Sequence, residues 1–416
     1  MTIPAMNGFT LLFLAALALM VAVQWWLARR QLRHVAKHRT SVPPAFRGQI
    51  SLDDHQRAAA YTLARTRLGR WELLYGSALL LLWTLGGGID LLDRLWRMAE
   101  LPPLAAGVGL LLSALLLMGL LELPFAWYRT FRLEQRFGFN RSTPALFIGD
   151  LLKQGLLVVL LGGPLAAVVL WLMAAAATWW WLYVWLVWLG FGLLVLWAYP
   201  AVIAPLFNKF EPLDDAALRR RIERLLQRSG FAASGVFVMD GSRRSAHGNA
   251  YFTGLGRNKR IVFFDTLLRS LDENEIEAVL AHELGHFRHR HVRQRLLLSA
   301  AFSLTGLALL GWLAETPWFY HGLGVSQPAR PVALLLFLLV VPVFTFFLHP
   351  LLTRRMRRQE FEADDFAVSQ SDAAHLVRAL VKLYQDNAST LTPDPLYSAF
   401  HDTHPPAPVR IARLTR

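Results

Sequence analysis

The chain contains no cysteine among its 416 residues. Disulfide bonds and thiolate metal ligands are therefore both excluded, so any zinc site has to be built from histidine and carboxylate side chains. Acidic residues are also scarce, because 29 Asp and Glu stand against 43 Lys and Arg, which gives a net charge of +14. The basic residues flank apolar runs and form no compact basic face. We therefore interpret the excess as the positive-inside bias of a membrane protein and expect no nucleic-acid partner.

Hydrophobic residues, by contrast, are abundant: they make up 55% of the chain, against 17% charged residues. They gather in runs of about 18 residues or more, which indicates transmembrane helices. The first run is followed directly by Arg29 and Arg30 and has no cleavage pattern, so we expect a retained anchor. Gly86, Gly87 and Gly88 weaken the second run as a helix. The sequence predicts seven spans, at about 8–27, 74–92, 104–127, 147–175, 179–206, 296–313 and 332–348.

The loops between these runs predict the orientation. Ten Lys or Arg residues lie in 29–70 and four in 128–143, whereas the alternate loops carry few. The positive-inside rule then places the N-terminus outside and the C-terminus in the cytosol.

The composition changes between the fifth and sixth spans, where residues 208–295 are polar and patterned like a soluble domain. An amphipathic helix is expected at 214–229, strands at 235–239 and 260–264, and a third strand at 249–253. We predict a mainly α, polytopic membrane protein with an α+β domain that faces the cytosol. Its divisions are 1–207 (five spans), 208–295 (first part of this domain), 296–348 (spans six and seven) and 349–416 (second part).

The strongest chemical signal in the chain is an H-E-x-x-H motif at residues 282–286. Asp272 and Glu275 form an N-terminal capping pattern, which predicts that the motif lies on a helix. Histidines four residues apart share one helical face, so His282 and His286 can reach the same metal ion. Glu283 can take a proton from a water at the metal and later pass it to the leaving amine.

A catalytic zinc site needs a third protein ligand and an open position for water. Glu360 and Asp364 are four residues apart on the next cytosolic segment, so that one carboxylate can bind the metal while the other holds a ligating histidine. Glu362 would be the competitor, although it points elsewhere on the helix. The alternative is that these acids balance the neighbouring arginines in solvent.

Other ionisable residues are more ambiguous. His289 and His291 lie outside the i, i+4 pair, and we interpret them as basic residues where a helix approaches the membrane. Asp150 and Lys153 can form an i, i+3 pair, but their roles, and that of Glu122, stay open between a structural pair, snorkelling and a cavity lining.

Several further motifs give the chain a resemblance to a known family. They occur in order along nearly the whole chain, at 42–43, 50–52, 61–64, 134–140, 203–210, 249–252, 360–364 and 404–406. Together with the expected helix that carries the H-E-x-x-H motif (the metal helix), this set resembles the type I CAAX prenyl endopeptidases, which are integral-membrane zinc metalloproteases.

The resemblance implies a bundle of seven helices around a large water-filled chamber, with the zinc near the cytosolic side. It implies Glu360 as the third zinc ligand, and the segment Asn249, Ala250 and Tyr251 as the edge strand that pairs with the substrate backbone. It also implies that His404 and Arg410 stabilise the oxyanion. From the residues alone, His404 would be a surface histidine with His401 as its rival.

We therefore predict that the cytosol-facing α+β domain is a zincin-like metalloprotease domain that holds one Zn²⁺ per chain. Its predicted reaction is peptide-bond hydrolysis near the C-terminus of CAAX-type or other membrane-associated proteins. If the chain is bacterial, a membrane-protein quality-control protease without prenylated clients is the alternative, and the membrane would be the inner or plasma membrane. A transporter or lipid-binding protein with a structural HExxH is a hypothesis of another class.

The partners expected are a peptide or protein substrate, lipidated or not, and membrane lipids. The oligomeric state stays open, with a monomer favoured.

Overall fold

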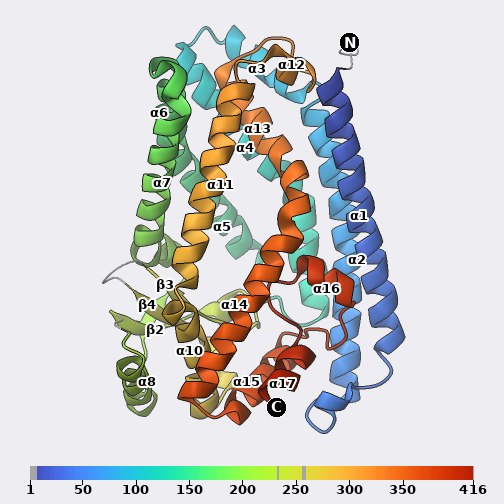
Figure 1. Cartoon of the computed structure of the whole chain (residues 1–416), viewed down its shortest axis with the longest axis vertical. Coiled ribbons are helices and arrows are strands. Elements are labelled where there is room, and N and C mark those ends of the chain that lie inside the picture. The colour runs from blue at the N-terminus through green and yellow to red at the C-terminus, as the bar shows by residue number, and fades with distance from the viewer. Residues whose placement is uncertain (1–6, 232–233, 255–258, 416) are drawn as a thin grey trace.

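The computed structural model describes residues 7–231, 234–254 and 259–415. Long helices run along the longest axis of the molecule, and a small sheet with several shorter helices lies at one end (Figure 1). Helix α1 begins at the end far from the sheet, whereas α17 lies on the same side as the sheet. The apolar and the polar parts of the sequence therefore form two distinct regions of the molecule.

Six helices in the described residues are long and apolar enough to cross a membrane, and one bent pair makes the number up to seven. Large side chains on their outer faces are well exposed, for example Leu152 at 70% and Leu297 at 61%, as expected for contact with lipid. The predicted polytopic fold with about seven spans is confirmed. The six spans are α1 (Gly8–His38), α4–η2 (Pro103–Tyr128, Arg129–Glu134), α5–η3–α6 (Pro144–Leu157, Val158–Gly162, Gly163–Ala175), η4–α7–η5–η6 (Ala177–Trp179, Trp180–Ala198, Tyr199–Ile203, Ala204–Leu206), α11 (His291–Leu313) and α13–η9–α14 (Arg330–Thr345, Phe346–Leu348, His349–Gln370).

The bent pair accounts for the remaining predicted span. Helix α2 (Leu52–Trp83) and helix α3 (Gly88–Met98) meet at an angle of 47°. Gly87 lies at the break with a φ of 78°, a left-handed conformation that glycine adopts without strain. The glycine run therefore interrupts the helix, as its composition predicted.

The sheet lies in the polar segment between α7 and α11. Its strands are β1 (Phe210–Pro212), β2 (Gly235–Met239), β3 (Ala250–Thr253) and β4 (Arg260–Phe264), in the order β1-β2-β4-β3. Strands β2 and β4 are parallel, and the other two pairs are antiparallel. The three predicted strands are present, whereas β1 was not predicted because three residues ending in proline give no alternating pattern.

Helices pack around this sheet and form a core separate from that of the membrane bundle. Ile222 of the helix after β1, Phe263 of β4 and Ala281 of the metal helix are all fully buried in this core. The helices of this core are α8 (Ala216–Arg228), α9 (Asp265–Ser270), α10 (Glu273–Arg288) and α15 (Ala373–Asp386), with the C-terminal ends of α14 and of α17 (Ala407–Leu414). Helix α16 (Pro395–His401) packs instead against α14 and α1. The remaining short elements are η1 (Pro44–Phe46), η7 (Gly241–Arg243) and α12 (Pro317–His321).

A cavity of about 1460 Å³ lies between the two regions. Its wall includes Arg70 of α2 and Gln154 of α5 on the membrane side, and Asn249 and His404 on the side of the sheet. A cavity is thus present where the family resemblance implied a chamber.

An ion pair ties the two regions together beside this cavity. Arg244, which follows η7, donates from Nε and Nη2 to the two carboxylate oxygens of Asp150 on α5, at 2.8 and 2.9 Å. Lys153 lies 3.9 Å from Asp150 and donates to the carbonyl of Leu206 at 2.8 Å. The predicted pair of Asp150 and Lys153 is therefore present, but the bidentate partner of Asp150 is Arg244.

Candidate metal centre

The H-E-x-x-H motif lies on α10, as predicted. The Asp272 side chain accepts hydrogen bonds from the backbone of Asn274 and Glu275, and the Glu275 side chain accepts one in return, which completes a capping box. The helix then carries His282 and His286 on one side, with their ring centroids 5.0 Å apart. His282 is only 6% exposed, so its imidazole is held away from bulk water.

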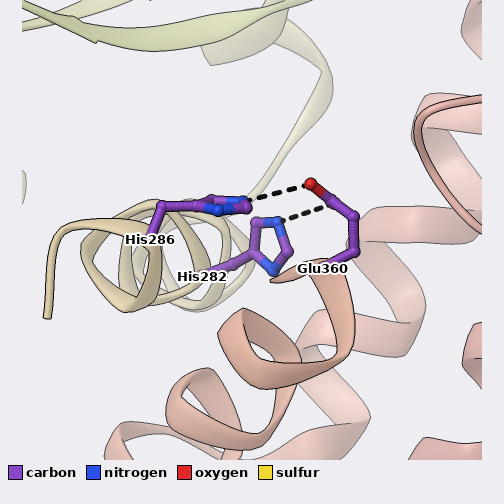
Figure 2. Close-up of side chains that lie close together, drawn as sticks. All are labelled: His282, His286 and Glu360. Atoms are coloured by element: carbon purple, nitrogen blue, oxygen red, sulfur yellow. Dashed lines mark ion pairs between the residues drawn. The ribbon is translucent and has the colours of Figure 1, made fainter. Parts of the chain in front are cut away.

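Helix α14 brings Glu360 to the same point, as Figure 2 shows. One oxygen of Glu360 lies 3.4 Å from Nε2 of His282, and the other lies 3.2 Å from Nε2 of His286. Ligands of a tetrahedral zinc ion, with bonds of about 2.0–2.1 Å, are separated by about 3.3–3.4 Å. The three side chains therefore have the donor types and the spacing of a zinc site. They are the one group of this kind among the described residues.

The close approach of the two helices depends on small residues. A Cβ atom on Gly285 would lie 2.8 Å from Cα and 3.0 Å from the carbonyl oxygen of Ala363 on α14. The first distance is shorter than real Cβ contacts and the second is at their lower limit, so a larger residue at position 285 would push the helices apart. Gly285 lies between the two histidines in sequence, and its missing side chain lets Glu360 reach them.

Behind His282 lies a buried charged pair. Nδ1 of His282 is 2.9 Å from an oxygen of Asp364, which is fully buried. Asp364 also accepts two hydrogen bonds from Arg410, which is 6% exposed. Glu360 and Asp364 thus both reach His282, from one face of α14, as their spacing predicted.

This arrangement makes the surroundings of His282 favourable for a cation. Burial lowers the pKa of His282, but hydrogen bonds from its ring to Asp364 and Glu360 outweigh that effect and raise the pKa to about 9. The negative field that would hold a proton there attracts a divalent ion equally well, and a metal would displace the proton on binding.

The second histidine has a different partner. Nδ1 of His286 lies 3.0 Å from Nδ1 of His291, and Nε2 of His291 lies 2.9 Å from a carboxylate oxygen of Glu362. His291 is fully buried. Its interpretation as a basic residue at the membrane approach was therefore wrong, whereas the neighbouring His289 is exposed. Glu362 does point away from the metal group, as expected, and the contact it makes instead is with His291.

Glu283 is half-buried on the same helix. Among the described residues, no hydrogen bond or ion pair involves its carboxylate. A carboxylate beside His282 and without a partner among those residues is available to a water or a substrate.

Two C-terminal residues named in the sequence analysis lie at this centre. Nδ1 of His404 is 2.6 Å from an oxygen of Glu360, and the His404 side chain is 63% exposed and borders the cavity. Arg410 lies deeper, behind His282. The rival, His401, also borders the cavity but packs against Tyr397, with ring centroids 4.5 Å apart and the ring planes tilted by 43°. Burial, with His349 nearby, lowers the pKa of His401 to about 4, so it stays neutral.

Strand β3 begins at the edge of the cavity. It pairs with β4 alone among the described strands, so its other edge has no strand partner there. Asn249 is on the cavity wall, and Ala250 and Tyr251 are the first residues of the strand. The segment expected to receive a substrate backbone is therefore an edge strand that starts at the cavity.

A helical membrane bundle that carries a largely buried His–His–Glu group beside a cavity has the features expected of a membrane-embedded metallopeptidase. Residues 31–209 match the family described as CAAX prenyl protease N-terminal, five membrane helices, and residues 212–416 match peptidase family M48. The chain is 33% identical to the CAAX prenyl protease 1 homolog of Oryza sativa, over 96% of each chain. It is 32% identical to CAAX prenyl protease 1 of Saccharomyces cerevisiae, over 94% of this chain and 91% of that one.

A solved structure agrees with these sequence matches. The crystal structure of S. mikatae Ste24p matches 99% of this chain and 100% of that chain, with a TM-score of 0.91 and 29% identity. The chain belongs to the CAAX prenyl protease 1 family of M48 peptidases, as the motifs predicted, and it is a multi-pass membrane metalloendopeptidase.

Proposed function

We propose that this chain is a zinc endopeptidase that hydrolyses peptide bonds near the C-terminus of membrane-associated proteins, with prenylated CAAX-type proteins as the first substrates to test. The observation that carries this proposal is the group of His282, His286 and Glu360, whose ligand atoms all lie within 4.8 Å of one another beside the cavity. The relatives from rice and yeast are named CAAX prenyl proteases, which motivates the choice of substrate.

The donor set suits one zinc ion per chain. Two imidazole nitrogens and one carboxylate oxygen leave a fourth position open, as catalytic zinc sites require. A bound zinc ion would supply Lewis acidity toward a water and toward the carbonyl of the scissile bond. Asp364 and His291 accept or donate at the other ring nitrogens, so both histidines would present Nε2 toward the metal.

Glu283 is the proposed general base and acid. Its carboxylate takes a proton from the attacking water as the oxygen adds to the scissile carbonyl carbon. It then gives that proton to the amide nitrogen as the carbon–nitrogen bond breaks. Its lack of a hydrogen-bonding partner among the described residues leaves both oxygens available for this transfer.

His404 and Arg410 are the proposed stabilisers of the tetrahedral state. His404 is exposed to the cavity at the rim of the metal group, where a ring N–H can donate to the developing negative charge. Arg410 directs its hydrogen bonds to Asp364, so its positive charge would act from behind His282. We assign to Asn249, Ala250 and Tyr251 the pairing of the substrate backbone with the edge of β3.

The remaining proposals concern the whole chain. We keep the orientation with the N-terminus outside and the metal centre facing the cytosol. The basic loops support it, and so does the start of α1 at the end of the molecule opposite the sheet (Figure 1). We also keep the four-part division of the chain at 207, 295 and 348, contact with membrane lipids, and a monomer as the working oligomeric state.

The test is the variant Glu283→Gln, assayed beside the unchanged protein in detergent with a farnesylated CAAX peptide. Glutamine keeps the shape of the side chain but cannot accept the proton, so we expect zinc content to stay the same and hydrolysis to fall about 10²–10⁴-fold. Cleavage that survives the substitution would refute the role of Glu283 as general base and acid. Purified protein that holds no zinc and cleaves no tested peptide would favour a non-catalytic membrane protein.

A second arm separates the two substrate classes. The same peptide without its prenyl group, and an unfolded membrane-protein fragment, are given to both forms of the enzyme. A clear preference for the farnesylated peptide supports the CAAX assignment. Equal or better cleavage of the other substrates favours the quality-control alternative, and leaves the zinc chemistry intact.

A further inference from the structure

Successive residues of β3 point their backbone N–H and C=O groups toward opposite edges of the strand. The N–H of Phe264 donates to the carbonyl of Asn249 at 2.9 Å, and Ala250 then lies opposite Phe263 in the antiparallel pair. Residues that exchange hydrogen bonds alternate along such a pair with residues that do not. Asn249 and Tyr251 therefore direct their peptide groups toward β4, whereas Ala250 and Phe252 direct theirs to the outer edge.

Gly248, one residue before Asn249, continues this alternation, but its peptide groups already have a partner. Its N–H donates to Oδ1 of Asn387 at 3.2 Å, and its carbonyl accepts from Nδ2 of Asn387 at 3.4 Å. The side-chain amide of Asn387, at the end of α15, thus pairs with Gly248 as a residue of a neighbouring strand would. A substrate strand could pair with Gly248 only by breaking both of these hydrogen bonds.

The next outer position is covered in a different way. The N–H of Ala250 donates to the side-chain oxygen of Asn249 at 2.8 Å. This hydrogen bond is exposed and joins neighbouring residues. A rotation of the Asn249 side chain therefore frees the Ala250 N–H, which can then donate to the carbonyl of a substrate. On the outer edge, the side chain that hydrogen-bonds to Ala250 can move away, whereas the side chain that hydrogen-bonds to Gly248 is held in place.

Asn387 is fixed because a chain of contacts holds it from the membrane side. Nδ1 of His247 lies 3.1 Å from the same oxygen of Asn387, and Nε2 of His247 lies 3.6 Å from a carboxylate oxygen of Glu134. The ring of Phe139 stacks on His247, with centroids 4.2 Å apart. Tyr61 donates to the other oxygen of Glu134 at 2.6 Å.

These contacts explain motifs that the metal chemistry leaves unused. Residues 61–64 and 134–140 are far from the metal ligands in sequence, yet Tyr61, Glu134 and Phe139 border the same cavity as Gly248 and Asn387. They connect the membrane bundle to the start of the edge strand.

We propose that Asn387 is a positioning residue that closes the outer edge of β3 at Gly248 and thereby fixes the register in which an extended substrate pairs with Ala250 and Phe252. This inference rests on the proposed function, because it concerns which bond of the substrate reaches the metal centre. Backbone pairing alone permits shifts of two residues, since alternate residues present the same hydrogen bonds. A fixed end to the ladder removes one of these shifted registers.

The experiment compares the products of one extended farnesylated peptide, identified by mass spectrometry, from the unchanged enzyme and from Asn387→Ala. Alanine frees both peptide groups of Gly248, and two hydrogen bonds no longer oppose the shifted register. We expect the share of a product cut two residues away to rise at least about tenfold. Asn387→Asp keeps the acceptor but loses the donor, so its share of shifted product should lie between that of the unchanged enzyme and that of Asn387→Ala.

Gln385→Ala is the matched control, because Gln385 lies on the same helix and its side chain bonds to Asp54 instead of β3. It should give the products of the unchanged enzyme. A single, unshifted product from both Asn387 variants, with zinc content retained, overturns the proposal.

A measurement without hydrolysis separates this proposal from the proposed function. A photo-reactive peptide is bound to the Glu283→Gln protein with and without Asn387→Ala, and the cross-linked residues are mapped. Adducts that move by two residues along the peptide support the register proposal even if no tested peptide is cleaved. Adducts at one unchanged position contradict it, whatever the activity of the enzyme.

Discussion

The two histidines of α10 are held by partners of different kinds. His282 contacts Asp364, which is 0% exposed, and this carboxylate is paired with the buried Arg410. His286 contacts the uncharged ring of His291, and the contacts end on Glu362, whose side chain is 37% exposed. One histidine is thus oriented by a buried ion pair and the other by a relay that ends near solvent.

The difference predicts unequal consequences when each partner is removed. Breaking a buried ion pair leaves an uncompensated charge and costs about 3–5 kcal/mol. Removing His291 leaves no buried charge behind, because the Glu362 side chain is 37% exposed and its carboxylate stays in contact with water, so the cost should be smaller. The partner of His282 should therefore matter for both metal binding and folding, whereas the partner of His286 should matter mainly for metal binding.

The largest effect is expected for Asp364→Ala. The substitution removes the acceptor of the His282 ring and leaves the Arg410 guanidinium buried without its carboxylate. We expect zinc affinity, measured by competition with a chelator, to fall about 100-fold, and the thermal unfolding temperature to fall clearly. Asp365→Ala is the control, because the Asp365 side chain is 58% exposed and, within the described part of the chain, forms an ion pair with Arg413 alone. Equal behaviour of the two variants would show that the buried pair is not needed.

A substitution between the histidines should affect both of them. In Gly285→Ala, the added methyl meets the backbone of Ala363 and pushes α10 away from α14. Overpacking of this kind costs about 1–3 kcal/mol, and zinc affinity should fall because Glu360 is displaced from both histidines. Gly119→Ala, at a helical position with open space around it, serves as the control. If Gly285→Ala binds zinc normally, the spacing of the helices does not set the metal geometry.

The smallest effect is expected for His291→Gln. Glutamine can replace both contacts of the ring, with His286 and with Glu362, but its side chain is more flexible than an imidazole and holds His286 less firmly. We therefore expect zinc affinity to fall about 10-fold with little change in unfolding temperature. His289→Gln, which alters an exposed histidine of the same turn, should bind zinc as the unchanged protein does. A loss as large as that of Asp364→Ala would remove the distinction between the two partners.

The same comparison shows what the sequence could and could not predict. Asp364 was found as a partner for a ligating histidine because it lies one helical turn after Glu360, and such spacing can be read directly from the chain. His291 was misinterpreted because its contact depends on a backbone turn. Arg290 adopts a left-handed conformation with a φ of 58°, and this turn lets α11 begin with His291 against His286. No residue type at position 290 signals that turn, since glycine would be the usual one.

The fold, too, has features that the sequence predicts and features that it does not. Long apolar runs predicted the membrane helices, and alternating residues predicted β2 and β4 at their observed bounds. The contact between Asn387 and Gly248 joins residues far apart in the chain, and no periodicity in either segment indicates it. Contacts within one element can thus be predicted from a single sequence, whereas contacts that depend on how elements meet cannot.

The place of α14 in the chain has a consequence for the synthesis of the protein. The HExxH helix leaves the ribosome before the last two apolar helices, and Glu360 follows only after α13. Until α14 has packed against α10, the nascent chain holds the two histidines of the His–His–Glu group without its carboxylate. The proposed metal site is therefore incomplete while the protein is being made, and it forms only after the last apolar helix has been synthesised.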